Sequence, residues 1–130
     1  MKTSELTGAA LDWAVAKAEG YSTTSDGIST LLKRGEELLM LGPGASPLNY
    51  SPSTDWAQGG PIIEREGIST VLLYGSTWGA TTYPVHQIGK DHSEAYYQGT
   101  GPTPLVAAMR CYVASKLGDE VELPAELTGE

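Results

Sequence analysis

Basic residues are scarce in this sequence of 130 residues. Lysine and arginine together number 8 against 16 aspartates and glutamates, which gives a formal net charge of -8. A chain of this charge has no general attraction for nucleic-acid phosphates, so a basic groove for DNA or RNA is excluded. Charge mimicry of DNA is an alternative interpretation of the acidity, but ordinary solubility explains the acidity better.

Cysteine and long apolar runs are also lacking. Cys111 is the only cysteine, so an internal disulfide is excluded, and its position in an apolar-periodic run indicates a buried side chain rather than a nucleophile. No apolar run approaches the ~20 residues that span a bilayer, and the N-terminus has no signal-peptide pattern. We therefore expect a cytoplasmic protein with no membrane partner.

The length fits one domain that buries its own core. We predict a single α/β sandwich domain over residues 1–118 and an acidic C-terminal tail over residues 119–130. Val121, Leu123 and Leu127 are the tail residues expected to dock on the domain.

Three helices are predicted from capping residues and apolar periodicity. The first is capped by Thr3 or Ser4 and runs to about Ala18. The second covers residues 54–66, where Gly59-Gly60-Pro61 predicts either a kink or a true start at Pro61. In the third, Thr103 caps the helix, Pro104 takes the first helical position and Gly118 closes the end. Its inward face is predicted to consist of Leu105, Ala108, Met109, Tyr112 and Val113.

Two hairpins are predicted between these helices. The strands of the first cover residues 28–32 and 37–41, and those of the second cover residues 68–74 and 78–85. Residues 21–27, 42–52 and 89–101 are predicted to be loops. The sequence therefore predicts an α+β fold, an α/β/α-type sandwich with a mostly antiparallel sheet flanked by about three helices.

Residues 50–67 hold the densest group of polar side chains, directly before a predicted helix. Such side chains can cap the helix, and they can also line a pocket beside its N-terminus. The second use predicts a ligand site, which we build from the polar and aromatic residues of this stretch, the nearest hairpin tryptophan and two arginines. These residues are Tyr50, Ser51, Ser53, Thr54, Asp55, Trp56, Gln58, Trp78, Arg65 and Arg110.

The chemistry of these residues suits a nucleotide-like molecule. Indole rings offer flat faces to a base, Asp55 can accept hydrogen bonds from ribose hydroxyls, and backbone amides near residues 53–56 can bind a phosphate. Arg65 or Arg110 would add positive charge. The structural alternative is that Asp55 caps the helix and pairs with Arg110, and that Trp56 belongs to the core. A Walker-type loop is excluded, since no Gly-Lys-Ser/Thr sequence occurs.

Other candidate sites are weaker. His86, Asp91, His92 and Glu94 match no metal-binding spacing and are interpreted as loop residues. No Gly-x-Ser-x-Gly elbow occurs, so no catalytic residue, metal or cofactor is assigned. Trp78 and three tyrosines form an alternative aromatic surface for a host protein or for self-association. The tyrosines are Tyr83, Tyr96 and Tyr97.

Three blocks of the sequence together resemble the NinX-like family of small phage proteins. They cover residues 4–17, 50–67 and 101–113, and their spacing is similar to that of the phage α-β-α sandwich domain. The resemblance implies a phage or prophage accessory protein in the cytoplasm of an infected or lysogenic bacterial host. It implies no established activity, so no catalytic residue is carried over.

Small phage accessory proteins often antagonise host defence. This analogy, together with the polar residues of the 50–67 stretch, suggests the main functional hypothesis. We expect a binding protein that sequesters a small nucleotide-derived host immune signal, with a neighbouring subunit able to complete the pocket. One alternative is a protein–protein antagonist of a host defence or restriction protein. Another is a hydrolase or lyase of the same signal, although nothing catalytic in the sequence requires it.

Overall fold

The computed structural model describes residues 1–25, 29–42, 48–82 and 97–127. Three α-helices, seven strands and two short 3-10 helices occur in these residues, which confirms the predicted α+β class with mostly antiparallel strands. In chain order the elements are η1 (Thr3–Glu5), α1 (Gly8–Ala18), β1 (Ser22–Ser25), β2 (Thr30–Arg34), β3 (Glu37–Leu41), β4 (Asn49–Tyr50), α2 (Trp56–Glu66), β5 (Ser69–Tyr74), β6 (Thr77–Thr81), β7 (Gly99–Gly101), α3 (Pro104–Leu117) and η4 (Ala125–Leu127).

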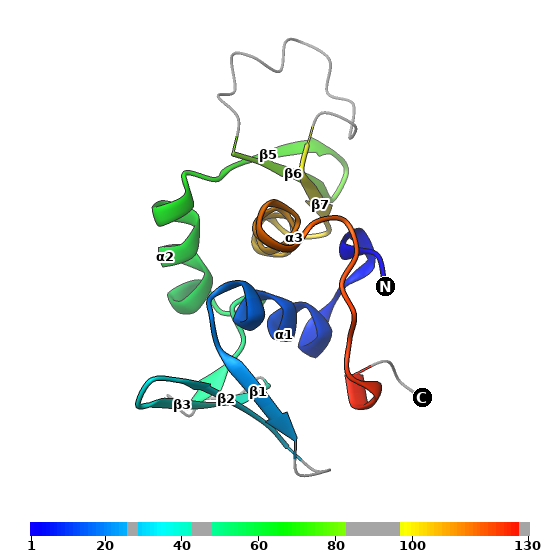
Figure 1. Ribbon diagram of the computed structural model, residues 1–130. Coiled ribbons are helices and arrows are strands. Elements are labelled where there is room, and N and C mark those ends of the chain that lie inside the picture. Colours follow the sequence, from blue (N-terminus) through cyan, green and yellow to red (C-terminus); the bar gives the residue numbers. More distant parts are fainter. Residues whose placement is uncertain (26–28, 43–47, 83–96, 128–130) are drawn as a thin grey trace.

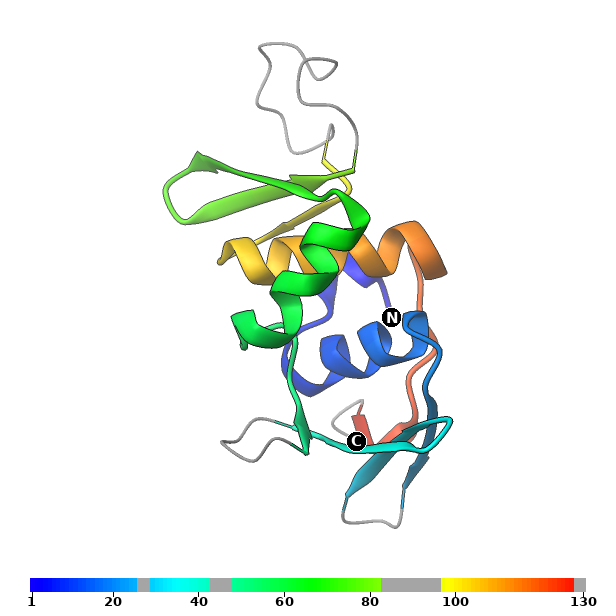
Figure 2. The same cartoon turned by 90° about the vertical axis from the view of Figure 1, so that its left-hand side faces the viewer.

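The strands are divided between two sheets, and the helices lie between them (Figures 1 and 2). One face of α3 packs on the β5–β7 sheet, and its other side meets α1 and α2. The β1–β4 sheet lies beyond α1, at the opposite end of the molecule. The buried core is therefore centred on α3, which contacts helices and strands around most of its circumference.

The four-stranded sheet has the order β1-β2-β3-β4. The predicted hairpin of β2 and β3 is confirmed, with Lys33 opposite Leu38 and Arg34 opposite Glu37. The loop prediction for residues 22–25 is wrong, because these residues form β1 and pair antiparallel with β2. Their small polar side chains gave no strand signal, and the partner strand supplies the hydrogen bonds that decide their conformation.

The three-stranded sheet has the order β5-β6-β7. The hairpin of β5 and β6 is confirmed, while residues 99–101, predicted as part of a loop, form β7 against β6. Close packing on α3 explains the glycine at the start of β7. A Cβ atom on Gly99 would lie 2.3 Å from the carbonyl oxygen of Ala107 and 2.4 Å from the amide nitrogen of Cys111.

The capping prediction for α3 is confirmed. The Thr103 hydroxyl accepts a hydrogen bond from the Val106 amide, and Pro104 occupies the first turn. The five residues expected to face inward are all buried, and the predicted burial of Cys111 is confirmed. Ala107 and Arg110, for which no burial was predicted, are buried as well.

The starts of the other helices differ from the prediction. Thr3 belongs to η1 and α1 begins only at Gly8, so capping by Thr3 or Ser4 is wrong. Helix α2 begins at Trp56 and continues through Pro61, so a start at Pro61 is also wrong. Asp55 caps α2 by accepting a hydrogen bond from the Ala57 amide, and this cap with the tertiary packing of Gly59 sustains the turn before the proline.

The two ends of the chain lie together. Lys2 and Glu120 form an antiparallel bridge, and the amide of Val121 donates to the carbonyl oxygen of Met1 over 2.9 Å. Docking of the tail is confirmed, since Val121 is buried and Leu123 and Leu127 pack against the core. None of the helices in the described ranges combines the length and the apolar character needed to cross a membrane.

Candidate functional site

The start of the polar stretch lines one wall of a cavity of about 260 Å³, which we call the tyrosine pocket. Tyr21 and Tyr50 face each other there, with ring centroids 5.5 Å apart. Tyr21 reaches this position because α1 ends with Gly20 at a positive φ, and the amide of Tyr21 then donates to the carbonyl oxygen of Ala16. The pocket is lined by Glu19, Tyr21, Glu37, Leu39, Asn49, Tyr50, Gln58 and Ile62.

One arginine–glutamate pair lies at the Tyr21 side of the pocket. Glu37 accepts hydrogen bonds from the Tyr21 hydroxyl over 2.7 Å and from the Arg34 guanidinium over 3.0 Å. The guanidinium of Arg34 also stacks on the ring of Tyr21, with 4.4 Å between its central carbon and the ring centroid. Burial, and then the hydrogen bond to Glu37, raise the pKa of Tyr21 to about 12, so this phenol stays protonated at neutral pH.

A second pair lies beside the first, since Arg34 Nη1 donates to the carbonyl oxygen of Glu19 over 2.9 Å. Glu19 accepts hydrogen bonds from Arg65 and from the hydroxyl of Tyr112. Burial alone would raise the pKa of Glu19, but the hydrogen bonds from Arg65 and Tyr112 outweigh it, so the pKa is lowered and the carboxylate stays charged. The hydroxyl of Tyr50 has a raised pKa, because the side chain is buried, and it remains a neutral donor.

The backbone amides of the polar stretch are used inside the protein. The amide of Ser51 donates to Gln58 Oε1 over 2.7 Å, and the amide of Ser53 donates to Asp12 Oδ1 over 2.8 Å. The amides of Thr54 and Asp55 both donate to the carbonyl oxygen of Ser51. The predicted phosphate contact with the amides near residues 53–56 therefore lacks free donors at three of those four positions.

The ten predicted site residues are distributed over several places. Tyr50 and Gln58 line the tyrosine pocket, and Arg65 reaches its wall through Glu19. Ser53, Thr54 and Trp56 line a separate cavity of about 220 Å³ beside the start of α3. Ser51 is buried, Asp55 caps α2, Trp78 lies opposite Leu72 and Gly101 in the second sheet, and Arg110 lines a further cavity near the two ends of the chain.

The structural alternative for two of these residues needs correction. Asp55 caps its helix as expected, but it does not pair with Arg110, whose guanidinium donates instead to the carbonyl oxygens of Leu6 and Thr100. Trp56 is 55 % exposed, so its assignment to the core is wrong. It lies in the first turn of α2, where its indole remains open to solvent.

Most of the tyrosine pocket was not predicted from the sequence. Tyr21, Arg34 and Glu37 come from a segment that carried no site prediction. The end of α1 and the pairing of β3 with β4 bring them to Tyr50. One signal was present. An apolar residue directly after a helix-ending glycine often packs back on the helix, and Tyr21 follows Gly20 in this way.

The candidate metal residues His86, Asp91, His92 and Glu94 lie outside the described residues, as do Tyr83 and Tyr96 of the aromatic surface. Across residues 1–25, 29–42, 48–82 and 97–127, no group of three or more acidic, histidine or cysteine side chains is placed to hold a metal ion. Trp78 and Tyr97, the remaining members of the aromatic surface, are both half-buried.

A comparison with known protein families identifies the family of this chain. The family described as bacteriophage P22 NinX matches residues 2–116, which include every residue of the tyrosine pocket. The chain belongs to the NinX family. The protein is therefore phage-encoded, as the resemblance implied. No curated protein matches the sequence of this NinX-family chain.

Proposed function

We propose that this NinX-family chain is a phage accessory binding protein that sequesters a small nucleotide-derived host immune signal in the tyrosine pocket. The supporting observation is that two tyrosines and the glutamates of two arginine–glutamate pairs line one cavity of about 260 Å³. Ligand sites are mostly apolar clefts with a few placed polar groups, and Leu39 and Ile62 supply the apolar floor here.

Each part of the pocket has a role in this proposal. The tyrosine rings offer faces and edges to a base, and the carboxylates of Glu19 and Glu37 accept hydrogen bonds from ribose hydroxyls. The side chain of Arg34 is 46 % exposed at the rim, where a phosphate can exchange for part of its contact with Glu37. The volume lies just below the usual ~300–1,000 Å³ of ligand sites, so the phosphate stays on the rim.

Binding without conversion is the simplest outcome for this set of groups. Hydrogen bonds from Arg65 and Tyr112 keep Glu19 charged, and the phenols of Tyr21 and Tyr50 are protonated, so none of these three groups is a proton acceptor poised near neutral pH. A hydrolase or lyase of the same signal remains the catalytic alternative, and the chemical state of the released ligand distinguishes the two.

The test is a depletion assay. The purified protein is incubated with a panel of cyclic and linear nucleotide signals, filtered, and heated to release what it bound, and both fractions are chromatographed. We expect one signal to be depleted from the filtrate and released intact. Release in altered form would assign an enzyme, and a panel that stays wholly in the filtrate would contradict the proposal.

A matched pair of variants locates the site. Arg34→Ala removes the stacked rim cation and should weaken binding about tenfold, the usual consequence of losing a charge-assisted hydrogen bond. Lys33→Ala removes the same charge from the neighbouring residue, whose side chain points to the opposite face of the strand. Equal losses in both variants would indicate a general charge effect instead of the tyrosine pocket.

A protein–protein antagonist is the second candidate. Its support is β5, an edge strand whose Leu72 and Tyr74 are 50 % and 58 % exposed. Large exposed apolar side chains on a strand edge favour contact with another chain. Stable co-purification with one host defence protein, lost in a Leu72→Ser/Tyr74→Ser variant, would favour this candidate, and self-association lost in the same variant would indicate a homo-oligomer.

A further inference from the structure

Arg110 is a charged residue in the middle of the central helix. It is 9 % exposed, and its guanidinium donates from Nε to the carbonyl oxygen of Leu6 over 2.9 Å and from Nη1 to that of Thr100 over 2.8 Å. These bonds connect α3 to the segment before α1 and to β7. The arginine therefore holds three parts of the chain together through neutral acceptors.

The charge of Arg110 has no counter-ion among the described residues. The ion pairs of this part of the chain involve Arg34, Arg65 and Lys116, and none of them includes Arg110. Burial lowers the pKa of its guanidinium, and no carboxylate of the described ranges raises it. Arginine stays protonated in proteins, so a buried and unpaired guanidinium is a strong local attraction for an anion.

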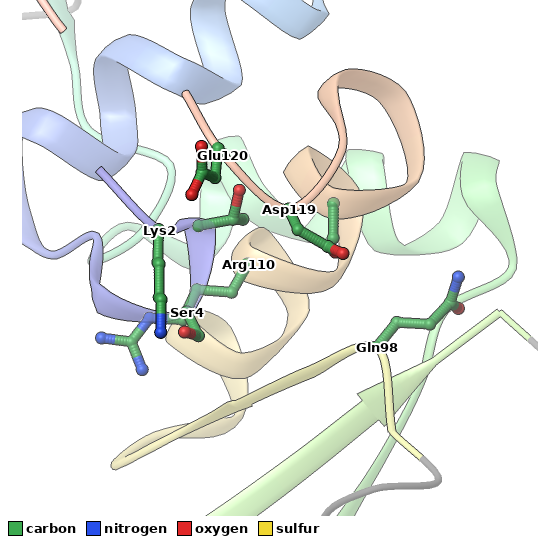
Figure 3. A pocket seen from close by; sticks show the side chains of 8 residues that line it. Lys2, Ser4, Gln98, Arg110, Asp119 and Glu120 are labelled. Carbon is green, nitrogen blue, oxygen red and sulfur yellow. The ribbon is translucent and has the colours of Figure 1, made fainter. Parts of the chain in front are cut away.

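A cavity of about 190 Å³ opens beside this guanidinium. In Figure 3 the ammonium group of Lys2 lies on the same side of the cavity as the guanidinium of Arg110, and Ser4 lies next to them. Gln98 lies on the other side, and its amide group is directed away from Arg110 and Lys2. Its Oε1 accepts hydrogen bonds from the amide and hydroxyl of Thr82, so this side chain is used inside the fold.

We propose that this cavity, the Arg110 pocket, binds a small oxyanion, which is a phosphate or carboxylate group. Nη2 and the second N–H of Nη1 have no partner among the described residues, so both can donate to such a group. Lys2 and Ser4 add a cation and a hydroxyl at the same wall. The pocket shares no lining residue with the tyrosine pocket, so the proposal does not depend on the proposed function.

Two carboxylates also line the pocket. Asp119 and Glu120 belong to the segment that follows α3, and neither forms an ion pair with Arg110. They repel an entering oxyanion, since the chain already carries a net charge of -8. Neutralising them should therefore strengthen oxyanion binding, an effect opposite to that of removing a cation from the same pocket.

The test uses inorganic phosphate and acetate as probes, titrated at constant ionic strength against chloride. Binding is followed by the NMR signal of the Arg110 Nε–H group and by the melting temperature. We expect a saturable shift of that signal and a saturable rise in Tm with at least one of the two probes. The more effective probe shows whether the pocket prefers a phosphate or a carboxylate.

Charge variants make the test specific. Asp119→Asn/Glu120→Gln should lower the Kd for the probe, and Lys2→Gln should raise it. Arg110→Gln should raise the Kd about tenfold or more, which is the usual effect of losing a charge-assisted hydrogen bond. If Arg110→Gln fails to fold, the other two variants still decide the result, because their substituted side chains are exposed at the surface.

A control separates the pocket from the overall charge. Glu36→Gln/Glu64→Gln removes the same two negative charges at exposed positions outside the Arg110 pocket and should leave the Kd unchanged. Absence of a saturable response in both the natural chain and Asp119→Asn/Glu120→Gln would overturn the proposal. An equal gain in the control would overturn it as well. Because the probes contain no base, a failure here leaves the tyrosine pocket untouched, and a nucleoside without phosphate tests that pocket alone.

Discussion

Asp12 is a carboxyl group enclosed by the core. It is 2 % exposed, and its Oδ1 accepts the hydrogen bond from the amide of Ser53. Burial raises its pKa to about 6, and the contribution of Ser53 lowers it only in part. This carboxyl joins α1 to the polar stretch, so Ser53, predicted to contact a ligand, has a structural partner on its amide.

The raised pKa of Asp12 makes stability depend on pH. A carboxyl whose pKa is higher in the folded state stabilises the fold fully below its unfolded pKa, and this contribution is lost as the pH rises through the folded pKa. The stabilisation by Asp12 is therefore lost between pH 3.8 and about pH 6. As the pH rises through this range, the free energy of unfolding of Asp12→Asn should increase by about 3 kcal/mol relative to that of the natural chain. This figure follows from about 1.4 kcal/mol for each unit of pKa shift.

Urea denaturation of both proteins between pH 4 and pH 8 measures this difference. The exposed Glu64→Gln substitution, outside both pockets, is the control for removing one carboxylate. If the free energy of unfolding of Asp12→Asn changed with pH in the same way as that of the natural chain, Asp12 would not titrate as its burial implies.

Helix α2 shows how one element depends on its neighbours. Its Gly59-Gly60-Pro61 sequence has a low intrinsic helix propensity, yet the helix continues through it. Gly59 lies against two other parts of the chain. A Cβ atom at this position would come within 2.5 Å of the carbonyl oxygen of Pro52 and 2.5 Å of Leu105 Cδ1. Gly60, one residue later, has no such neighbour within 4 Å.

Alanine should therefore be tolerated less well at Gly59 than at Gly60. Gly59→Ala should lower the free energy of unfolding by about 1–3 kcal/mol, because the added methyl group overpacks the contact with Pro52 and α3. Gly60→Ala should change it by less than about 1 kcal/mol, because the entropy that alanine gains in a helix is opposed by the contact of its methyl group with the ring of Pro61. Guanidinium denaturation of the two variants measures both effects, and a loss at Gly60 as large as at Gly59 would refute the packing argument.

At the scale of the whole molecule, the two ends of the chain close the structure. The N-terminal amine of Met1 donates to the carbonyl oxygen of Val121 over 2.9 Å, and the hydroxyl of Thr3 donates to that of Gly118 over 2.7 Å. The same segments supply Lys2, Thr3, Asp119 and Glu120 to the Arg110 pocket. The pairing of the ends thus stabilises the fold and shapes that cavity together.

Val121 is the anchor of this pairing, because its side chain is buried in the core cluster. Val121→Ala should lower the free energy of unfolding by about 1–3 kcal/mol through the cavity it leaves. The exposed neighbour Glu122→Ala is the matched control, expected to stay within about 0.5 kcal/mol of the natural chain. Chemical denaturation compares the two. Equal stability of both variants would show that the tail contributes no packing energy.

Local signals determined several features from the sequence alone. Thr103 and Pro104 define the start of α3 because a hydroxyl cap and a ring with a fixed φ act within one turn. The two hairpins follow from β-forming runs joined by short turns. The apolar residues of the tail predicted its docking. In the cap and the hairpins the interacting groups are close in sequence, and in the tail the apolar residues themselves indicate burial, although their partners are distant in sequence.

Only the tertiary structure decided the rest. Residues 22–25 and 99–101 become strands because partner strands pair with them, and the helices lie between two sheets because α3 is apolar on nearly every side. The polar stretch was ambiguous for a physical reason. The same hydroxyls, amides and carboxylates satisfy a helix end or a ligand equally well, and the choice depends on Asp12 and Tyr21, which contact the stretch only in the folded chain.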